Sequence, residues 1–110
     1  MAAEAARAAQ RKADRLACEA WNMRMRQEGG PLQPSPSLRA AISGGFRFLL
    51  VQCEGCRTHA YVDLEAVRRP PGTPIWRLER SLACDMCRAK NNRAPRAVIQ
   101  RLTCEASSGT

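Results

Sequence analysis

Two short motifs hold the side chains of this sequence that are best suited to chemistry. The motifs share the spacing Cys-x-x-Cys and read Cys53-Glu54-Gly55-Cys56 and Cys84-Asp85-Met86-Cys87. Two thiolates at this spacing can bind one metal ion from a tight turn, and two such pairs complete a tetrahedral site with four sulfur ligands. The sequence therefore predicts one structural Zn²⁺ ion, with the ligands Cys53, Cys56, Cys84 and Cys87.

Other uses of a Cys-x-x-Cys motif fit this chain less well. Neither motif is followed by the histidine that covalent haem attachment requires. A thioredoxin-like redox site needs a larger strand and helix scaffold than 110 residues with these appendages can build. A four-cysteine site has no open coordination position, and no catalytic triad or pair of catalytic carboxylates can be assembled from the other residues. We therefore expect a protein that is not an enzyme.

An arginine directly follows each cysteine pair, at Arg57 and Arg88. Four thiolates around one Zn²⁺ ion leave a net negative charge, and nearby cations help to keep the sulfurs deprotonated. Both arginines are therefore candidates to support the ligands, although both could also point to solvent. Many zinc knuckles carry glycine at this position, so the two turns depart from the commonest form.

Five other side chains have both a binding and a structural interpretation. His59 could be a metal ligand or a strand residue, and Cys18 and Cys104 could be reactive thiols or small packing residues. Trp21 and Trp76 could stack on a nucleic-acid base or pack inside the protein. In each case the structural interpretation is simpler, and the sequence does not decide between them.

The elements that must position the cysteines lie in residues 46–104. Strand-like patterns at residues 46–52 and 59–64 predict a hairpin whose tip holds the first cysteine pair. Short helices at residues 64–68 and 74–81 then lead to the second pair, and residues 96–102 form a closing strand. This pattern predicts a small zinc-ribbon-like α+β domain with short antiparallel strands. Because aromatic residues make up only 5% of the chain, we expect a small core whose folding depends on the metal.

The flanking segments have different compositions. Residues 1–28 lack proline and glycine and predict an N-terminal helix whose first part is disordered. Residues 29–45 form a linker rich in proline and glycine that contains a short helix capped by Ser37. Residues 105–110 form a disordered tail. On the N-terminal helix, a narrow stripe could dock on the domain or on a partner protein, and it consists of Cys18, Trp21 and Met25.

Charge points to a polyanionic partner. The 18 basic and 10 acidic residues give a net charge of +8, and most of the cations are arginines. The candidate phosphate contacts are Arg47, Arg57, Arg77, Arg80, Arg88, Lys90, Arg93 and Arg96. The chain contains neither an apolar segment long enough to span a membrane nor a secretory signal, so we expect a cytoplasmic protein without a membrane partner. The sequence does not predict an oligomeric state.

Several short runs are similar to a group of small alphaproteobacterial proteins of unassigned function. The similar runs lie within residues 16–103 and are Cys18-Glu19-Ala20-Trp21-Asn22-Met23-Arg24, Pro34-Ser35-Pro36-Ser37, Cys53-x-x-Cys56-Arg57, Val62-Asp63-Leu64 and Leu82-x-Cys84-x-x-Cys87-Arg88. The resemblance implies a ribbon-type fold in a bacterial cytoplasm. The second half of the chain also resembles zinc ribbons of the transcription and translation machinery.

Two functional hypotheses follow from the sequence. In the first, the protein is a zinc ribbon that associates with nucleic acid, for example in transcription, through its arginines. In the second, it is a zinc-stabilised module that binds another protein through the helix stripe. A thiol redox switch is a third and more distant hypothesis.

Overall fold

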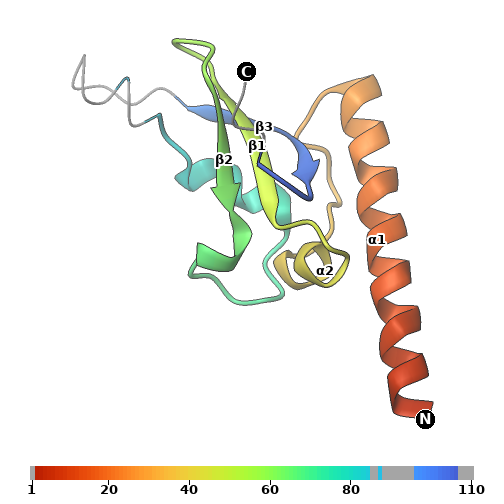
Figure 1. Ribbon diagram of the computed structural model, residues 1–110. Coiled ribbons are helices and arrows are strands. Elements are labelled where there is room, and N and C mark those ends of the chain that lie inside the picture. The colour runs from red at the N-terminus through yellow and green to blue at the C-terminus, as the bar shows by residue number, and fades with distance from the viewer. Residues whose placement is uncertain (1, 85–86, 88–95, 107–110) are drawn as a thin grey trace.

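The computed structural model describes residues 2–84, 87 and 96–106. Its helices and strands, in chain order, are α1 (Ala2–Glu28), α2 (Leu38–Ser43), β1 (Phe48–Cys53), β2 (His59–Asp63), the 3₁₀ helices η1 (Leu64–Ala66) and η2 (Ile75–Ser81), and β3 (Ala97–Thr103). Figure 1 shows the sheet in the middle, α1 along one side of it, and the N-terminal end of α1 projecting beyond the rest of the molecule. The fold is a small α+β structure.

The three strands form one antiparallel sheet in the order β2-β1-β3. The hairpin of β1 and β2 agrees with the strand-like patterns in the sequence, and its register pairs Leu49 with Val62 and Val51 with Ala60. Strand β3 closes the other side of β1, so that Cys53, the last residue of β1, pairs with Ala97. The predicted short antiparallel strands are therefore confirmed.

A β-bulge keeps the apolar residues of β3 on the inner face of the sheet. Leu50 pairs with Arg101 and Val51 pairs with Ile99, which leaves Gln100 as the extra residue. A regular strand turns residues three positions apart to opposite faces, but the extra residue restores the phase. Ile99 and Leu102 can therefore both be buried, at 1% and 2% exposure.

The core lies on this inner face, where all the helices contribute to it. Its buried side chains are Cys18, Trp21, Met25, Leu38, Ala41, Phe46, Leu49, Val51, Leu64, Ile75, Leu78, Ala97, Ile99 and Leu102. The stripe on α1 is therefore part of the core of the same chain. The hypothesis that this stripe binds a partner protein is wrong, because Cys18, Trp21 and Met25 are only 0%, 3% and 4% exposed.

Helix α1 spans the stretch that the sequence predicts to be helical. Residues 2–13 are helical with exposed side chains. The alanine-rich composition favours this helix, since alanine has the highest intrinsic helix propensity. In the part of the chain that the structure describes, no helix is both long and apolar enough to cross a membrane.

Side chains from two helices occupy the outer edge of β3. The amide of Asn22 on α1 donates to the carbonyl oxygen of Leu102 at 2.9 Å and accepts from the N–H of Leu102 at 2.8 Å. The carboxylate of Glu79 on η2 accepts from the N–H of Ile99 at 3.1 Å. These contacts replace the hydrogen bonds of a further strand, so they also block pairing with another chain at this edge.

Replacing Asn22 with alanine should lower the free energy of unfolding by about 1–3 kcal/mol, because two hydrogen bonds to the backbone are lost at once. Urea titration followed by circular dichroism measures this change. Gln27→Ala is the matched control, since Gln27 is exposed on the same helix and its loss should change stability by less than about 0.5 kcal/mol. Equal stabilities of the two variants would contradict a structural role for Asn22.

The predicted linker is anchored to the segment that leads to η2. Ser37 caps α2 as predicted, with its side chain accepting from the N–H of Ala40. The N–H of Trp76 donates to the hydroxyl oxygen of Ser35 at 3.1 Å, and the N–H of Ile75 donates to the carbonyl oxygen of Pro36 at 2.9 Å. These bonds fix where η2 begins and hence where the chain approaches the second cysteine pair.

Candidate metal centre

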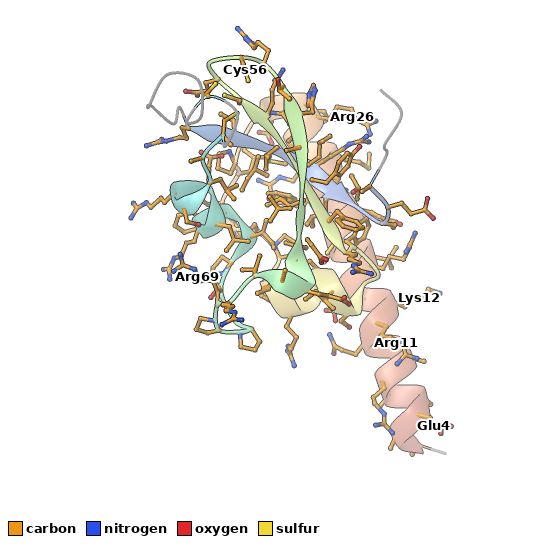
Figure 2. All side chains as sticks on the ribbon, turned by 60° about the vertical axis from the view of Figure 1, so that its left-hand side comes forward. Glu4, Arg11, Lys12, Arg26, Cys56 and Arg69 are labelled. Atoms are coloured by element: carbon orange, nitrogen blue, oxygen red, sulfur yellow. The ribbon has the colours of Figure 1, made fainter. Side chains whose placement is uncertain are left out.

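The first cysteine pair lies at the tip of the β1–β2 hairpin, where Figure 2 shows Cys56 at the end of the molecule. Cys53 is the last residue of β1, and its N–H donates to the carbonyl oxygen of Thr58 at 3.0 Å. Its carbonyl oxygen accepts from the N–H of Arg57, also at 3.0 Å. This closed turn holds Cys53 and Cys56 on the same side of the hairpin tip.

The second pair is positioned by η2 and by the beginning of β3. The N–H of Leu82 donates to the carbonyl oxygen of Glu79 at 3.2 Å, which ends η2. Ala83 forms an isolated antiparallel bridge with Arg96, whose carbonyl oxygen accepts from the N–H of Glu54 at 3.1 Å. Ala83, which precedes Cys84, and Glu54, which follows Cys53, are thus both tied to Arg96.

The four predicted ligands come together in the structure. All four sulfur atoms lie within 4.8 Å of one another. The sulfurs of Cys53 and Cys87 are 3.7 Å apart, as are those of Cys56 and Cys84. A tetrahedral ion with metal–sulfur bonds of about 2.3 Å requires sulfur atoms about 3.8 Å apart. The distances therefore match a four-sulfur metal site, and all four cysteines are free of disulfides.

Backbone amides supply hydrogen bonds to the sulfurs. The N–H groups of Gly55 and Cys56 point at the Cys53 sulfur at 3.3 and 3.5 Å, and the N–H of Cys87 points at the Cys84 sulfur at 3.5 Å. Such donors stabilise thiolates around a metal ion. This is the pattern that two knuckles, each built on a Cys-x-x-Cys turn, would provide.

Thr58 adds a side-chain hydrogen-bond partner to the site. This partner could not be recognised from the sequence. Its hydroxyl oxygen is 3.2 Å from the Cys56 sulfur. This hydrogen bond is the main reason why the pKa of Cys56 is lowered to about 6. Conversely, hydrogen bonding to Cys56 is the main reason why the pKa of Cys87 is raised to about 12. Without metal, these two shifts favour a thiolate at Cys56 and a protonated thiol at Cys87, and metal binding would displace the proton of Cys87.

The centre is buried on one side and open on the other. Cys53 and Cys87 are 2% and 7% exposed, whereas Cys56 is exposed and Cys84 is partly exposed. A metal ion bound here would connect the buried sulfurs of Cys53 and Cys87 to the exposed hairpin tip at Cys56. Such a location suits a structural ion better than a catalytic one, because four sulfurs occupy every position of a tetrahedron.

Arg57 contributes to the centre through its backbone. Its φ angle is 64°, in the left-handed region that glycine favours, and its side chain is exposed. Among the described residues, the hydrogen bonds that reach the sulfurs come from backbone amides and other cysteine or threonine side chains. Arg88, the second arginine predicted to support the ligands, lies outside the described residues.

Arg57→Gly should be more stable than Arg57→Ala by about 1 kcal/mol, because only the alanine variant retains the steric cost of a left-handed conformation. Both variants lose the guanidinium group, so their difference isolates the backbone. Thermal melts of the two metal-loaded proteins measure it. If the alanine variant is as stable as the glycine variant, the turn does not require this conformation. A shared loss of metal affinity would instead show that the side chain supports the sulfurs.

The remaining cysteines and the histidine lie away from the sulfur cluster. Within the described ranges, the four cysteines are the one group of three or more ligand-type side chains found together. Cys18 is buried, and burial is the main reason why its pKa is raised to about 12, which makes it an inert thiol. Cys104 is exposed, with its sulfur 4.0 Å from a nitrogen of Arg15. His59 is an exposed residue of β2.

The predicted phosphate contacts that the structure describes lie on different elements. Arg47 pairs with Asp63 at 3.1 Å and with Glu65 at 3.5 Å, and it lowers the pKa of Asp63. Arg77 and Arg80 lie on η2 and line a common pocket. Arg96 is at the edge of β3, next to the cysteines. The other three candidates lie outside the described residues and are Arg88, Lys90 and Arg93.

The pocket beside η2 also contains Arg69, which the sequence reading did not select. Arg69 follows η1 in a run of two arginines and two prolines, and this local pattern does not indicate its neighbours. Its position beside η2 depends on the loop through residues 70–74, which returns the chain to the linker.

Comparison of the chain with protein-family models, with curated proteins and with solved structures found no match.

Proposed function

We propose that this protein is a zinc-ribbon-like domain in which one structural Zn²⁺ ion holds a surface that binds nucleic acid. The four-sulfur cluster supports the metal half of this proposal. Four thiolates in a tetrahedral arrangement suit Zn²⁺ or an iron–sulfur cluster best among biological metals. One ion with no open coordination position supplies shape and stability, and not a reaction.

Metal analysis of the protein purified without added metal tests this half. We expect about one zinc per chain. Replacement by Co²⁺ should give the visible absorption of a tetrahedral thiolate site. Cys53→Ser should lose the metal, whereas Cys104→Ser, which changes an exposed cysteine outside the cluster, should keep it. Iron in place of zinc, or equal metal contents in the two variants, would overturn the assignment.

The nucleic-acid half rests on arginines that form no ion pair with an acidic residue in the described part of the chain. Between β2 and the second cysteine pair, residues 68–80 contain Arg68, Arg69, Arg77 and Arg80. Two acidic residues near them in the sequence have other partners, since Glu65 lies 3.5 Å from Arg47 and Glu79 binds the N–H of Ile99. Positive charge without internal neutralisation favours a polyanion, and phosphate is the preferred ligand of arginine clusters.

Binding should therefore weaken steeply with salt. Titration of a labelled oligonucleotide with the metal-loaded protein should give measurable affinity at about 50 mM salt and a large loss by about 200 mM, because bound counterions are released. The logarithm of the binding constant should fall linearly with the logarithm of the salt concentration. Absence of binding at low salt, or binding that is independent of salt, would overturn this half of the proposal while leaving the zinc site intact.

The alternative function is a module that binds another protein through the α1 stripe, but the side chains of this stripe are buried. The stripe packs on the inner side of the sheet, and the Nε1–H of Trp21 donates to the carbonyl oxygen of Leu32 at 3.2 Å. None of its three side chains is available to a partner groove while the protein is folded.

A further inference from the structure

A pocket among the described residues lies beside η2. It has a volume of about 660 Å³ and is lined by Arg69, Pro70, Thr73, Trp76, Arg77, Leu78, Arg80 and Ser81. This volume falls within the range of roughly 300–1,000 Å³ that is typical of small-molecule sites. Figure 2 shows Arg69 on the side of the molecule that carries η2.

The pocket is strongly positive. Three of its lining residues are arginines, and none of the described lining residues is acidic. Glu79, the carboxylate closest to them along η2, accepts from the N–H of Ile99 on β3 and so faces the sheet. The hydroxyl group of Thr73 adds a hydrogen-bond donor to the lining, whereas that of Ser81 donates to the carbonyl oxygen of Leu78 at 2.9 Å. This combination of guanidinium and hydroxyl groups suits a phosphate.

The pocket also offers flat surfaces for a ring. Trp76 lines it and is only half-buried, and the guanidinium carbon of Arg77 lies 5.4 Å from the centre of the Trp76 ring. Indole rings and guanidinium planes are the side-chain surfaces on which unpaired nucleic-acid bases stack. The same pocket thus joins a site for a phosphate to a site for a base. The other tryptophan, Trp21, is buried in the core and cannot serve this purpose.

We propose that the pocket of Arg69, Trp76, Arg77 and Arg80 binds one nucleotide unit, with the base stacked on Trp76 and the phosphate held by the arginines. The unit can come from a single strand of nucleic acid or from a free mononucleotide, because the two share this chemistry. The single-strand form rests on the proposed function and makes it more specific. A base inside a duplex presents no free face to Trp76, so duplexes are excluded from the pocket.

Tryptophan fluorescence of the metal-loaded protein tests the inference directly. Four probes are added separately at about 50 mM salt: an oligothymidylate of about ten nucleotides, its duplex with oligoadenylate, thymidine monophosphate and inorganic phosphate. We expect the oligothymidylate to quench the emission and the duplex to quench it much less. Trp76→Phe should lose the quenching but keep the binding, since its ring can still stack.

Two variants and one control measure the contribution of the pocket to affinity. Trp76→Leu should weaken binding of the oligothymidylate by at least about tenfold, because one stacked base is lost. Arg80→Gln should weaken it too, and should lower the salt slope by about 1. The control is Arg26→Gln, which removes one exposed arginine on α1, far from Arg69 in Figure 2. Circular dichroism and metal content confirm that each variant is folded.

The outcomes separate this inference from the proposed function. If the oligothymidylate binds but Trp76→Leu and Arg80→Gln lose no more affinity than Arg26→Gln, the pocket is overturned and nucleic-acid binding stands. If only thymidine monophosphate quenches, the pocket stands as a nucleotide site and nucleic-acid binding falls. If neither the oligothymidylate nor thymidine monophosphate quenches the emission, the pocket is overturned as a nucleotide site. The same conclusion follows if inorganic phosphate displaces these two probes equally well.

Discussion

Removal of the metal by a chelator is expected to unfold the protein at room temperature. Structural zinc contributes roughly 10–16 kcal/mol of apparent free energy at neutral pH. A small domain has a total free energy of unfolding of about 5–15 kcal/mol. The free energy of metal binding is therefore as large as the stability of the whole domain. The cysteines also join the hairpin tip to the chain that follows η2 and to the beginning of β3. Without the ion, the hairpin tip and Cys84 lose the bonds that join them directly.

Circular dichroism and thermal melts with and without chelator measure the effect, and re-addition of zinc should restore the folded signal. Cys53→Ser should behave like the chelated protein, while Cys104→Ser should melt like the wild type. The core is larger than the composition suggests, so stability without the metal can also be tested. An apo-protein that melts within a few degrees of the loaded protein would show that the core folds without the metal.

The four-cysteine cluster could be predicted from the sequence because the chemistry of each cysteine pair is local. Two residues between paired thiols fix a turn of the right size, and this spacing needs no knowledge of the rest of the fold. The caps on short helices are equally local, and the side chain of Asp63 accepts from the N–H of Glu65 at the beginning of η1. The strand-like patterns at residues 46–52 and 59–64 likewise predicted the hairpin of β1 and β2.

Features that depend on long-range packing could not be predicted in the same way. An apolar stripe such as that on α1 looks the same whether its partner is the same chain or another one. The amide of Asn22 gains its role only because β3, 80 residues later, presents a free edge to it. The bulge at Gln100 is similarly invisible, since the sequence alone places Ile99 and Leu102 on opposite faces of a regular strand.

The location of the pocket beside η2 also could not be predicted from the sequence. Arg77 and Arg80 were recognisable as cations, but equally so were Arg47 and Arg57. The structure separates them by their neighbours, because Arg47 is neutralised by two carboxylates whereas Arg80 lines a cavity with no acidic group among its described lining residues. Charge counts predict the class of partner, and only the arrangement of the side chains indicates where that partner binds.

Trp21→Ala should lower the free energy of unfolding by about 3–5 kcal/mol, the second-largest effect that we expect. The indole is only 3% exposed and fills the space between α1 and the rest of the core. Its loss leaves a cavity and also removes the donor to the carbonyl oxygen of Leu32. For a chain of this size, such a loss lowers the melting temperature by at least about 10 °C. Thermal melts of the zinc-loaded variant measure it.

Met23→Ala is the matched control on the same helix, because Met23 is 59% exposed and its truncation should change stability by less than about 0.5 kcal/mol. The comparison also tests whether α1 is part of the folded unit or a separate appendage. A helix that docked only on a partner protein would tolerate both substitutions in the isolated chain. A large loss for Trp21→Ala alone therefore requires the stripe to be buried within the same molecule, as the hydrogen bonds of Asn22 to β3 imply independently.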